Sequence, residues 1–114
     1  MKKLIAFFEI PAADFRRAID FYETVLNMKL PTCECEEEKM AFFTEGDEFV
    51  GAVSSEKGVL IHFNVDEIEP TLETILKKGG KVVIPKTKIE AEGRGYFAVF
   101  VDTEGNRVGI YADK

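Results

Sequence analysis

Residues 4–28 read LIAFFEIPAADFRRAIDFYETVLNM, and this stretch decides how the rest of the chain is organised. The residues before the first proline are almost all apolar, as in a central strand that is covered on both faces. Pro11 ends the strand, Asp14 is a residue type that caps helix N-termini, and Asn27 suits the left-handed conformation at a helix end. We therefore expect a strand, a turn and a helix. The helix positions expected to be buried are Ala18, Phe21, Tyr22 and Val25.

A weaker copy of the same pattern begins near Leu60. When Phe7 is placed on Leu60, the apolar positions of the two halves align, and both halves read as one strand, one helix and three strands. An internal repeat with a period near half of the chain length indicates two similar modules. We place the first module at residues 1–54 and the second at 59–114, joined by a polar connector at 55–58.

The local signals also predict where the other elements begin and end. The remaining strands are expected at 29–35, 40–44, 48–54, 59–65, 81–84, 96–101 and 107–111, and the second helix at 68–78. In that helix Leu72, Ile75 and Leu76 are expected to point inward. Pro85 is expected to close the strand at 81–84, and residues 86–95 to form a charged loop that serves as a lid or rim.

The composition limits the classes of function. The chain has 114 residues, of which 46% are hydrophobic and 32% charged, as in an ordinary soluble globular domain. A net charge of -6 argues against a nucleic-acid partner, which needs a basic surface. We find no signal-peptide pattern and no apolar run long enough for a membrane span, so we expect a cytoplasmic protein with no membrane partner. Cys33 and Cys35 are too few for a structural zinc site, and we expect reduced thiols.

Several motifs recur in a characteristic order. Residues 11–26 follow the pattern Pro-x-x-Asp-x-x-Arg-Ala-x-x-Phe-Tyr-x-x-Val-Leu; further motifs are FNVD at 63–66, GGKV at 79–82, GYFAVF at 95–100 and DTEGN at 102–106. Together they resemble the vicinal oxygen chelate superfamily, which comprises glyoxalases, bleomycin-resistance proteins and extradiol dioxygenases. The resemblance implies an α+β fold in which two βαβββ modules in tandem form a mixed sheet that curls around a cavity, and this cavity would be the ligand site.

The metal enzymes of this family carry His, Gln or Glu at four strand positions. The resemblance places these positions at Phe7, at Gly51 (or Ala52 if the register slips by one), at Leu60 and at Gly109. None of these side chains offers the oxygen or nitrogen donors that divalent ions need, so we expect no metal and no other cofactor. This departure argues against glyoxalase-type isomerase and ring-cleaving dioxygenase activity. The two glycines are expected to leave empty volume and to favour a roomy apolar pocket.

Strand alternation predicts which residues face the cavity, with the alternate, apolar residues packed under the helices. The predicted ligand-binding residues are Phe7, Glu9, Leu60, His62, Asn64, Arg94, Tyr96, Phe97, Arg107 and Tyr111. Arg94 and Arg107 could each clamp an anionic ligand, although an arginine beside a turn is more often a rim charge. Tyr96 and Phe97 could form an aromatic wall, and core packing is expected for at least one of them.

Glu9 and His62, the only histidine, occupy equivalent positions in the two modules and are the candidate catalytic residues. A carboxylate–imidazole pair could transfer protons, or the two groups could simply neutralise each other. Two main hypotheses therefore stay open: a metal-free protein that binds a small organic molecule in the cavity between the modules, and a metal-independent lyase or isomerase that uses this pair. A third is a module that acts through oligomerisation alone. We expect a homodimer, because exposed sheet edges need to be covered.

Overall fold

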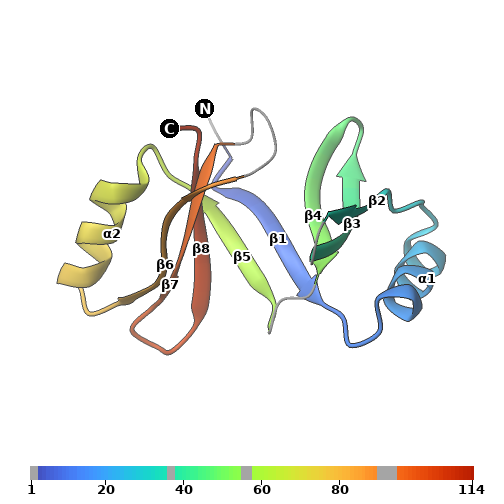
Figure 1. The fold of residues 1–114 in the computed structure, drawn as a ribbon, viewed down its shortest axis with the longest axis horizontal. Helices are drawn as coiled ribbons and strands as arrows, with labels where there is room; N and C mark the ends of the chain where they lie inside the picture. Colours follow the sequence, from blue (N-terminus) through green and yellow to red (C-terminus); the bar gives the residue numbers. More distant parts are fainter. Residues whose placement is uncertain (1–2, 36–37, 55–57, 90–94) are drawn as a thin grey trace. The chain divides into compact units, whose positions relative to one another are not determined.

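The computed structural model describes residues 3–35, 38–54, 58–89 and 95–114, apart from the side chains of 34, 35 and 38. Its elements are β1 (Ile5–Pro11), α1 (Phe15–Leu26), β2 (Thr32–Cys35), β3 (Glu38–Glu45), β4 (Glu48–Ser54), β5 (Leu60–Asn64), α2 (Ile68–Lys77), β6 (Lys81–Lys88), β7 (Tyr96–Val101) and β8 (Arg107–Ala112) (Figure 1). The order βαβββ occurs twice, which confirms the predicted α+β class and the internal repeat. Within the described ranges, no helix is long and apolar enough to cross a membrane.

The chain divides into two compact units, which we call the N-terminal unit (Phe7–Leu60) and the C-terminal unit (Met1–Ala6 with Ile61–Lys114). The strand order is β1-β4-β3-β2 in the first and β5-β8-β7-β6 in the second, so the two sheets have the same topology. In each unit the first and last strands are parallel, and the other pairs are antiparallel. Most of the predicted connector between the modules, residues 55–57, lies outside the described residues.

Helix α1 begins and ends where its capping residues predict. The Asp14 carboxylate accepts a hydrogen bond from the backbone N–H of Arg17 at 3.1 Å, which satisfies one of the free donors of the first turn. Asn27 has φ 52° and ψ 53°, the left-handed conformation that ends a helix. The Glu23 carboxylate accepts from the N–H of Leu30 at 2.9 Å and so ties the following chain to the helix. Both predicted boundaries are confirmed.

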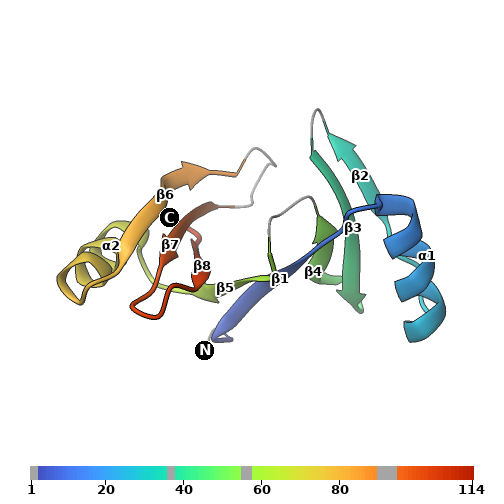
Figure 2. The same cartoon turned by 90° about the horizontal axis from the view of Figure 1, so that it is seen from below.

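The buried face of α1 matches the predicted one in part, because Ala18 and Tyr22 pack on the core as expected. Helix α1 lies beside the strands of its unit (Figure 2). Its residues Phe15, Ala18, Ile19 and Tyr22 pack on the core formed by Leu30, Ala41, Phe43 and Val53. Phe21 and Val25, which we expected to be buried, are 57% and 60% exposed. The helix carries two apolar stripes with the same spacing, and only the position of the sheet decides which of them is covered.

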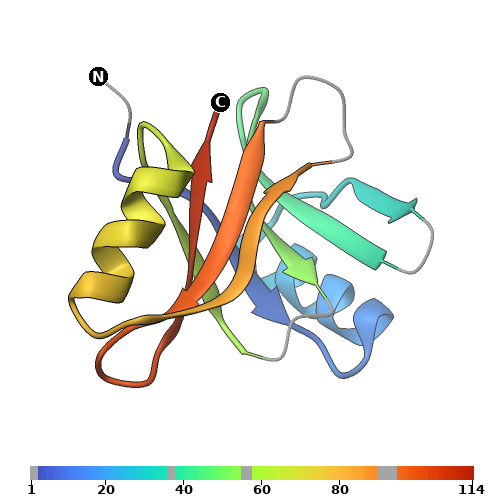
Figure 3. The same cartoon turned by 60° about the vertical axis from the view of Figure 1, so that its left-hand side comes forward.

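Helix α2 covers one face of the C-terminal sheet (Figure 3). Ile68 is fully buried and packs with Ala98, Ile110 and Ala112, and Leu72 and Ile75 flank this core cluster. The prediction for Leu76 is wrong, because its side chain is 56% exposed. Leu76 follows Ile75 by one position, so a helix packed on a single sheet turns it toward the edge of the contact.

Strand β6 does not end at Pro85, as the sequence predicted, but continues to Lys88. Because β6 is the edge strand of its sheet, the missing N–H of Pro85 removes no bond from the interior, and shifts in register on both sides of Ile84 accommodate the ring. The Lys86 ammonium lies 3.3 Å from Glu69 and 4.6 Å from the centre of the Tyr96 ring. Part of the predicted loop is thus strand, and residues 90–94 lie outside the described residues.

Cys33 takes part in a disulfide, so the prediction of a reduced thiol is wrong for this residue. That prediction rested on the lack of further zinc ligands, which bears on metal binding and not on disulfide formation. The side chain of Cys35 lies outside the described part of the chain.

The turn between β7 and β8 is organised by Asp102. Its carboxylate accepts hydrogen bonds from the N–H of Glu104 at 2.8 Å and from the N–H and side-chain amide of Asn106 at 2.9 and 3.1 Å. These bonds, above all that from the Asn106 backbone, lower the pKa of Asp102 below its ordinary value of 3.8. Gly105 has φ 85°, which a residue with a side chain rarely adopts. The turn therefore prefers the ionised form of Asp102.

We expect Asp102→Ala to destabilise the fold at neutral pH, and the difference from the unaltered protein to shrink in acid. A carboxylate whose pKa is lower in the folded state stabilises the fold fully above the unfolded value of 3.8, and this contribution is lost as the pH falls through the folded value. Urea denaturation of both proteins between pH 7 and pH 2 measures the difference. Glu104→Gln in the same turn is the control, because Glu104 contributes only its backbone N–H to the bonds on Asp102 and the variant keeps them. A difference that stays constant to pH 2 would contradict this role.

Candidate functional site

The C-terminal sheet has one apolar face under α2 and one face that carries polar residues. Phe63 and Ile110 belong to the core under α2. The register pairs His62 with Gly109 and Asn64 with Tyr111, and these residues alternate with the buried ones, so they lie on the face opposite the helix. This division of the two faces agrees with the one predicted from strand alternation.

The imidazole of His62 lies over the backbone of Gly109. A Cβ atom on Gly109 would come within 2.5 Å of Cε1 and 2.8 Å of Cγ, and closer still to Nδ1. The His62 residue is only 8% exposed. The prediction that Gly109 leaves empty volume is therefore wrong, because the side chain from the neighbouring strand fills this space.

Gly51 is also filled, but on the face toward α1. Phe8 and Phe43 pair with Gly51 from the two flanking strands, and their rings stack at 5.4 Å. A Cβ atom on Gly51 would lie 2.6 Å from Cδ1 of Phe8 and closer to Cε1 and Cζ. The expected empty volume is absent here too. By register, Ala52 and not Gly51 lies beside Glu9 and shares its face, as in the alternative alignment that the sequence allowed.

The face of the N-terminal sheet opposite α1 combines aromatic rings with the carboxylate of Glu9. Glu9 alternates with Phe8 and Ile10, which pack toward α1, and is 9% exposed. On the same face as Glu9, the ring centres of Phe7 and Phe42 are 6.5 Å apart. The rings of Phe42 and Phe49 form a stacked pair with centres 4.4 Å apart. The sequence prediction missed Phe42 and Phe49; pairing 40–44 with 48–54 across the Gly46 turn would have indicated them.

The side chains of Asn64 and Tyr111 form hydrogen bonds with residues near the two ends of the chain. The Asn64 side-chain amide donates to the carbonyl of Lys3 at 2.6 Å, and its backbone N–H donates to Leu4 at 2.7 Å. The Tyr111 hydroxyl donates to the Asp113 carboxylate at 3.1 Å.

The other predicted residues are spread over different environments. Tyr96 packs against the core under α2, whereas Phe97 pairs with Tyr111 and shares its face. Leu60 is 1% exposed, and Arg107 pairs with Val101 where β8 begins. Arg94 lies outside the described residues. A ligand-binding role for each of these residues stays a prediction.

The positions that would hold a metal do not fit one. Phe7, Ala52, Leu60 and Gly109 present no donor atom, and the space over Gly109 is taken by His62. Among the described residues, His, Cys, Asp and Glu side chains nowhere gather in a group of three or more that could hold an ion. These four positions therefore support no metal-based step.

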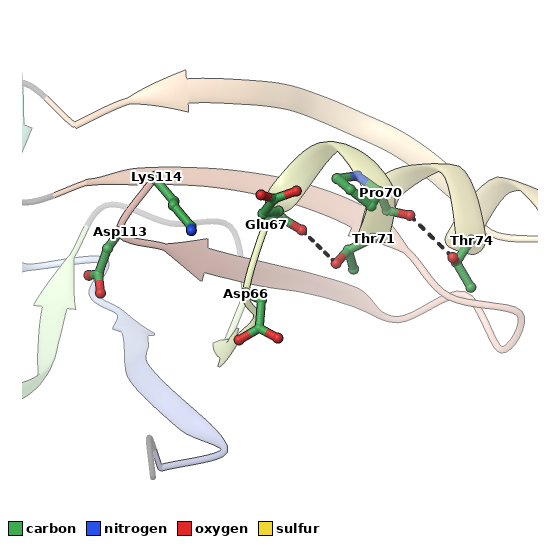
Figure 4. Close-up of a pocket in the computed structure, with 7 residues that line it drawn as sticks. All are labelled: Asp66, Glu67, Pro70, Thr71, Thr74, Asp113 and Lys114. Atoms are coloured by element: carbon green, nitrogen blue, oxygen red, sulfur yellow. Dashed lines mark hydrogen bonds between the residues drawn. The ribbon is translucent and has the colours of Figure 1, made fainter.

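A cavity of about 610 Å³ lies elsewhere in the C-terminal unit. It is lined by Asp66, Glu67, Pro70, Thr71, Thr74, Asp113 and Lys114. Figure 4 shows Asp113 and Lys114 on one side and the first turns of α2 on the other. The hydroxyls of Thr71 and Thr74 donate to the carbonyls of Glu67 and Pro70, so both hydroxyls are engaged with the backbone of the helix. None of the predicted ligand-binding residues lines this cavity.

The family assignment follows from sequence comparison. A family model for the Glyoxalase/Bleomycin resistance protein/Dioxygenase superfamily matches residues 4–110. The chain belongs to this superfamily. A protein of Didymella fabae described as a glyoxylase-like domain-containing protein is 34% identical over 113 residues, covering 90% of this chain and 88% of that protein. The resemblance inferred from the motifs is confirmed.

Solved structures share the superfamily fold. The Mn(II)-bound glyoxalase from Novosphingobium aromaticivorans is 17% identical with a TM-score of 0.71, over 96% of this chain and 38% of that one. A methylmalonyl-CoA epimerase from Streptomyces coelicolor, in complex with 2-nitronate-propionyl-CoA, is 15% identical with a TM-score of 0.66, over 96% of both chains. At these identities the likeness shows the fold alone.

Proposed function

We propose that this superfamily member binds a small organic molecule without a metal, on the sheet faces opposite α1 and α2. The observation that carries the proposal is that, among the described residues, each of these faces holds a buried ionisable side chain, Glu9 in one unit and His62 in the other. Burying such groups costs free energy, and they are enriched at functional sites. The rings of Phe7, Phe42 and Phe49 beside Glu9 favour a planar, partly apolar molecule with a polar group.

A second candidate function is a metal-independent lyase or isomerase in which Glu9 and His62 move protons. It is supported by the chemistry of the same two side chains, since a carboxylate and an imidazole can each act as a general base. Both functions place the ligand on the same faces. They differ in whether Glu9→Gln or His62→Gln abolishes binding or only turnover.

For the assembly, we propose a homodimer in the cytoplasm. The support for the dimer, which does not bear on the compartment, is on α1, where Phe21 and Val25 expose more than half of their surface. Exposed apolar side chains that lie together on one helix mark surfaces that other protein chains cover.

We expect thermal unfolding to respond to organic ligands and not to Ni, Zn, Mn, Fe or Mg. A compound at a hundred times its Kd stabilises the fold by about 2.7 kcal/mol, which corresponds to a rise in Tm of roughly 10 °C. Screening a metabolite and drug collection measures this shift, and light scattering of the same sample should give twice the chain mass of 12.8 kDa.

The variants make the test specific. Glu9→Gln and His62→Gln should weaken the apparent affinity for the ligand at least tenfold, a loss of about 1.4 kcal/mol in binding free energy. The ligand-induced rise in Tm should be smaller for the same reason. Glu73→Gln, at an exposed position on α2, is the control and should leave that rise unchanged. A large shift with one metal equivalent per chain would refute metal-free binding. Variants that still bind the hit compound but no longer convert it would favour the enzyme.

A further inference from the structure

The contact between His62 and Gly109 is closer than the register alone requires. Residues that face each other on neighbouring parallel strands normally direct their side chains outward, side by side, with strands about 4.8 Å apart. Here the imidazole crosses from β5 onto β8 and takes the volume that any side chain at position 109 would need. A Cβ within 2.5 Å of the ring is not tolerated without movement, and the ring cannot shorten as a flexible chain end can.

We propose that Gly109 positions the side chain of His62. The imidazole, which extends from β5 over β8, would then be the group that contacts the ligand. The proposal deepens the proposed function, on which it rests for the ligand. The basis of the proposal is geometric. The functional group, the His62 imidazole, belongs to β5, and Gly109 leaves the space on β8 that this ring occupies.

The ring of His62 is held close to the backbone of Gly109. The atoms that a Cβ on Gly109 would meet first are Nδ1, Cε1 and Cγ. With its ring held against the backbone and 8% exposed, His62 has little rotamer freedom left to lose. A preplaced imidazole loses less entropy when a ligand oxygen binds to it, and this is how preorganised sites gain affinity.

Gly51 supplies a matched comparison within the same chain. It has an aromatic neighbour at a similar, slightly longer distance, Phe8, but on the face toward α1, where the contact belongs to the core. Alanine at either position creates a collision of similar severity. Only alanine at 109 acts on His62.

The test compares Gly109→Ala with Gly51→Ala by NMR. Since His62 is the only histidine, the Cε1–H signal of its imidazole needs no assignment. We expect both variants to lower Tm by roughly 5–10 °C through overpacking. Only Gly109→Ala should move the imidazole signal away from its position in the unaltered protein. A folded Gly109→Ala variant with an unmoved imidazole signal would overturn the proposal.

A double variant covers the case in which Gly109→Ala does not fold. In a His62→Ala background the ring is gone, so alanine at 109 should lower Tm much less than it does beside the imidazole. Equal losses of Tm in both backgrounds would overturn the proposal. Neither measurement needs a ligand: a moved imidazole signal together with an empty compound screen would leave the positioning role intact and count against the proposed function alone.

Discussion

Replacing Phe43 with alanine is expected to lower the free energy of unfolding by about 3–5 kcal/mol. Phe43 is 6% exposed and stacks on Phe8, while the Tyr22 ring of α1 meets it edge-on at 5.4 Å. These contacts connect the sheet of the N-terminal unit to its helix over Gly51, which has no side chain to fill the gap left by the ring. Because whole domains are stable by only about 5–15 kcal/mol, the loss should be visible in urea denaturation followed by circular dichroism.

Phe49→Ala is the matched control for this prediction. Phe49 also stacks on another phenylalanine, Phe42, with ring centres 4.4 Å apart, but it is 39% exposed. Its removal should cost less than half as much, because the side chain gives up less buried surface and water can enter the site. Equal losses for the two variants would show that stacking of the rings, and not their burial, determines the stability of this unit.

Local signals predicted the fold well because they act over a few residues. Asp14 and Asn27 define the ends of α1 through bonds and backbone angles within one turn. Strand alternation likewise separated Phe63 and Ile110 from His62 and Asn64, since the period of a strand depends on neither its partners nor the register. The motifs then placed the chain in its superfamily.

Predictions that depended on a partner distant in the sequence were less successful. Gly51 and Gly109 look like cavities in a strand pattern, and only pairing with the neighbouring strands shows that Phe8 and His62 occupy them. The engagement of Asn64 with Lys3 joins residues 61 positions apart, which no local pattern indicates. The position of Pro85 on an edge strand is a property of the whole sheet.

For the C-terminal unit, Ile68→Ala is the substitution expected to have the largest effect, a loss of about 3–4 kcal/mol in the free energy of unfolding. Ile68 has no exposed surface and is the only residue of α2 that is fully buried among those described. Its neighbours in the core include Ala98 and Ala112, whose methyl groups cannot extend into the space that the isoleucine leaves. A site that cannot collapse keeps its cavity and gives losses in the upper part of the usual range.

Leu76→Ala on the same helix separates burial from helix propensity. Alanine favours the helix at both positions, but Leu76 is 56% exposed, so its replacement should cost less than about 1 kcal/mol. A comparable loss at both positions would mean that α2 is held by more than the core around Ile68. The Ile68 core also adjoins the candidate site, because Ile110 packs in this core and lies between Gly109 and Tyr111 on β8. Because the cavity is expected to persist, Ile110 should keep its place, and the His62 imidazole signal should stay in place in both Ile68→Ala and Leu76→Ala.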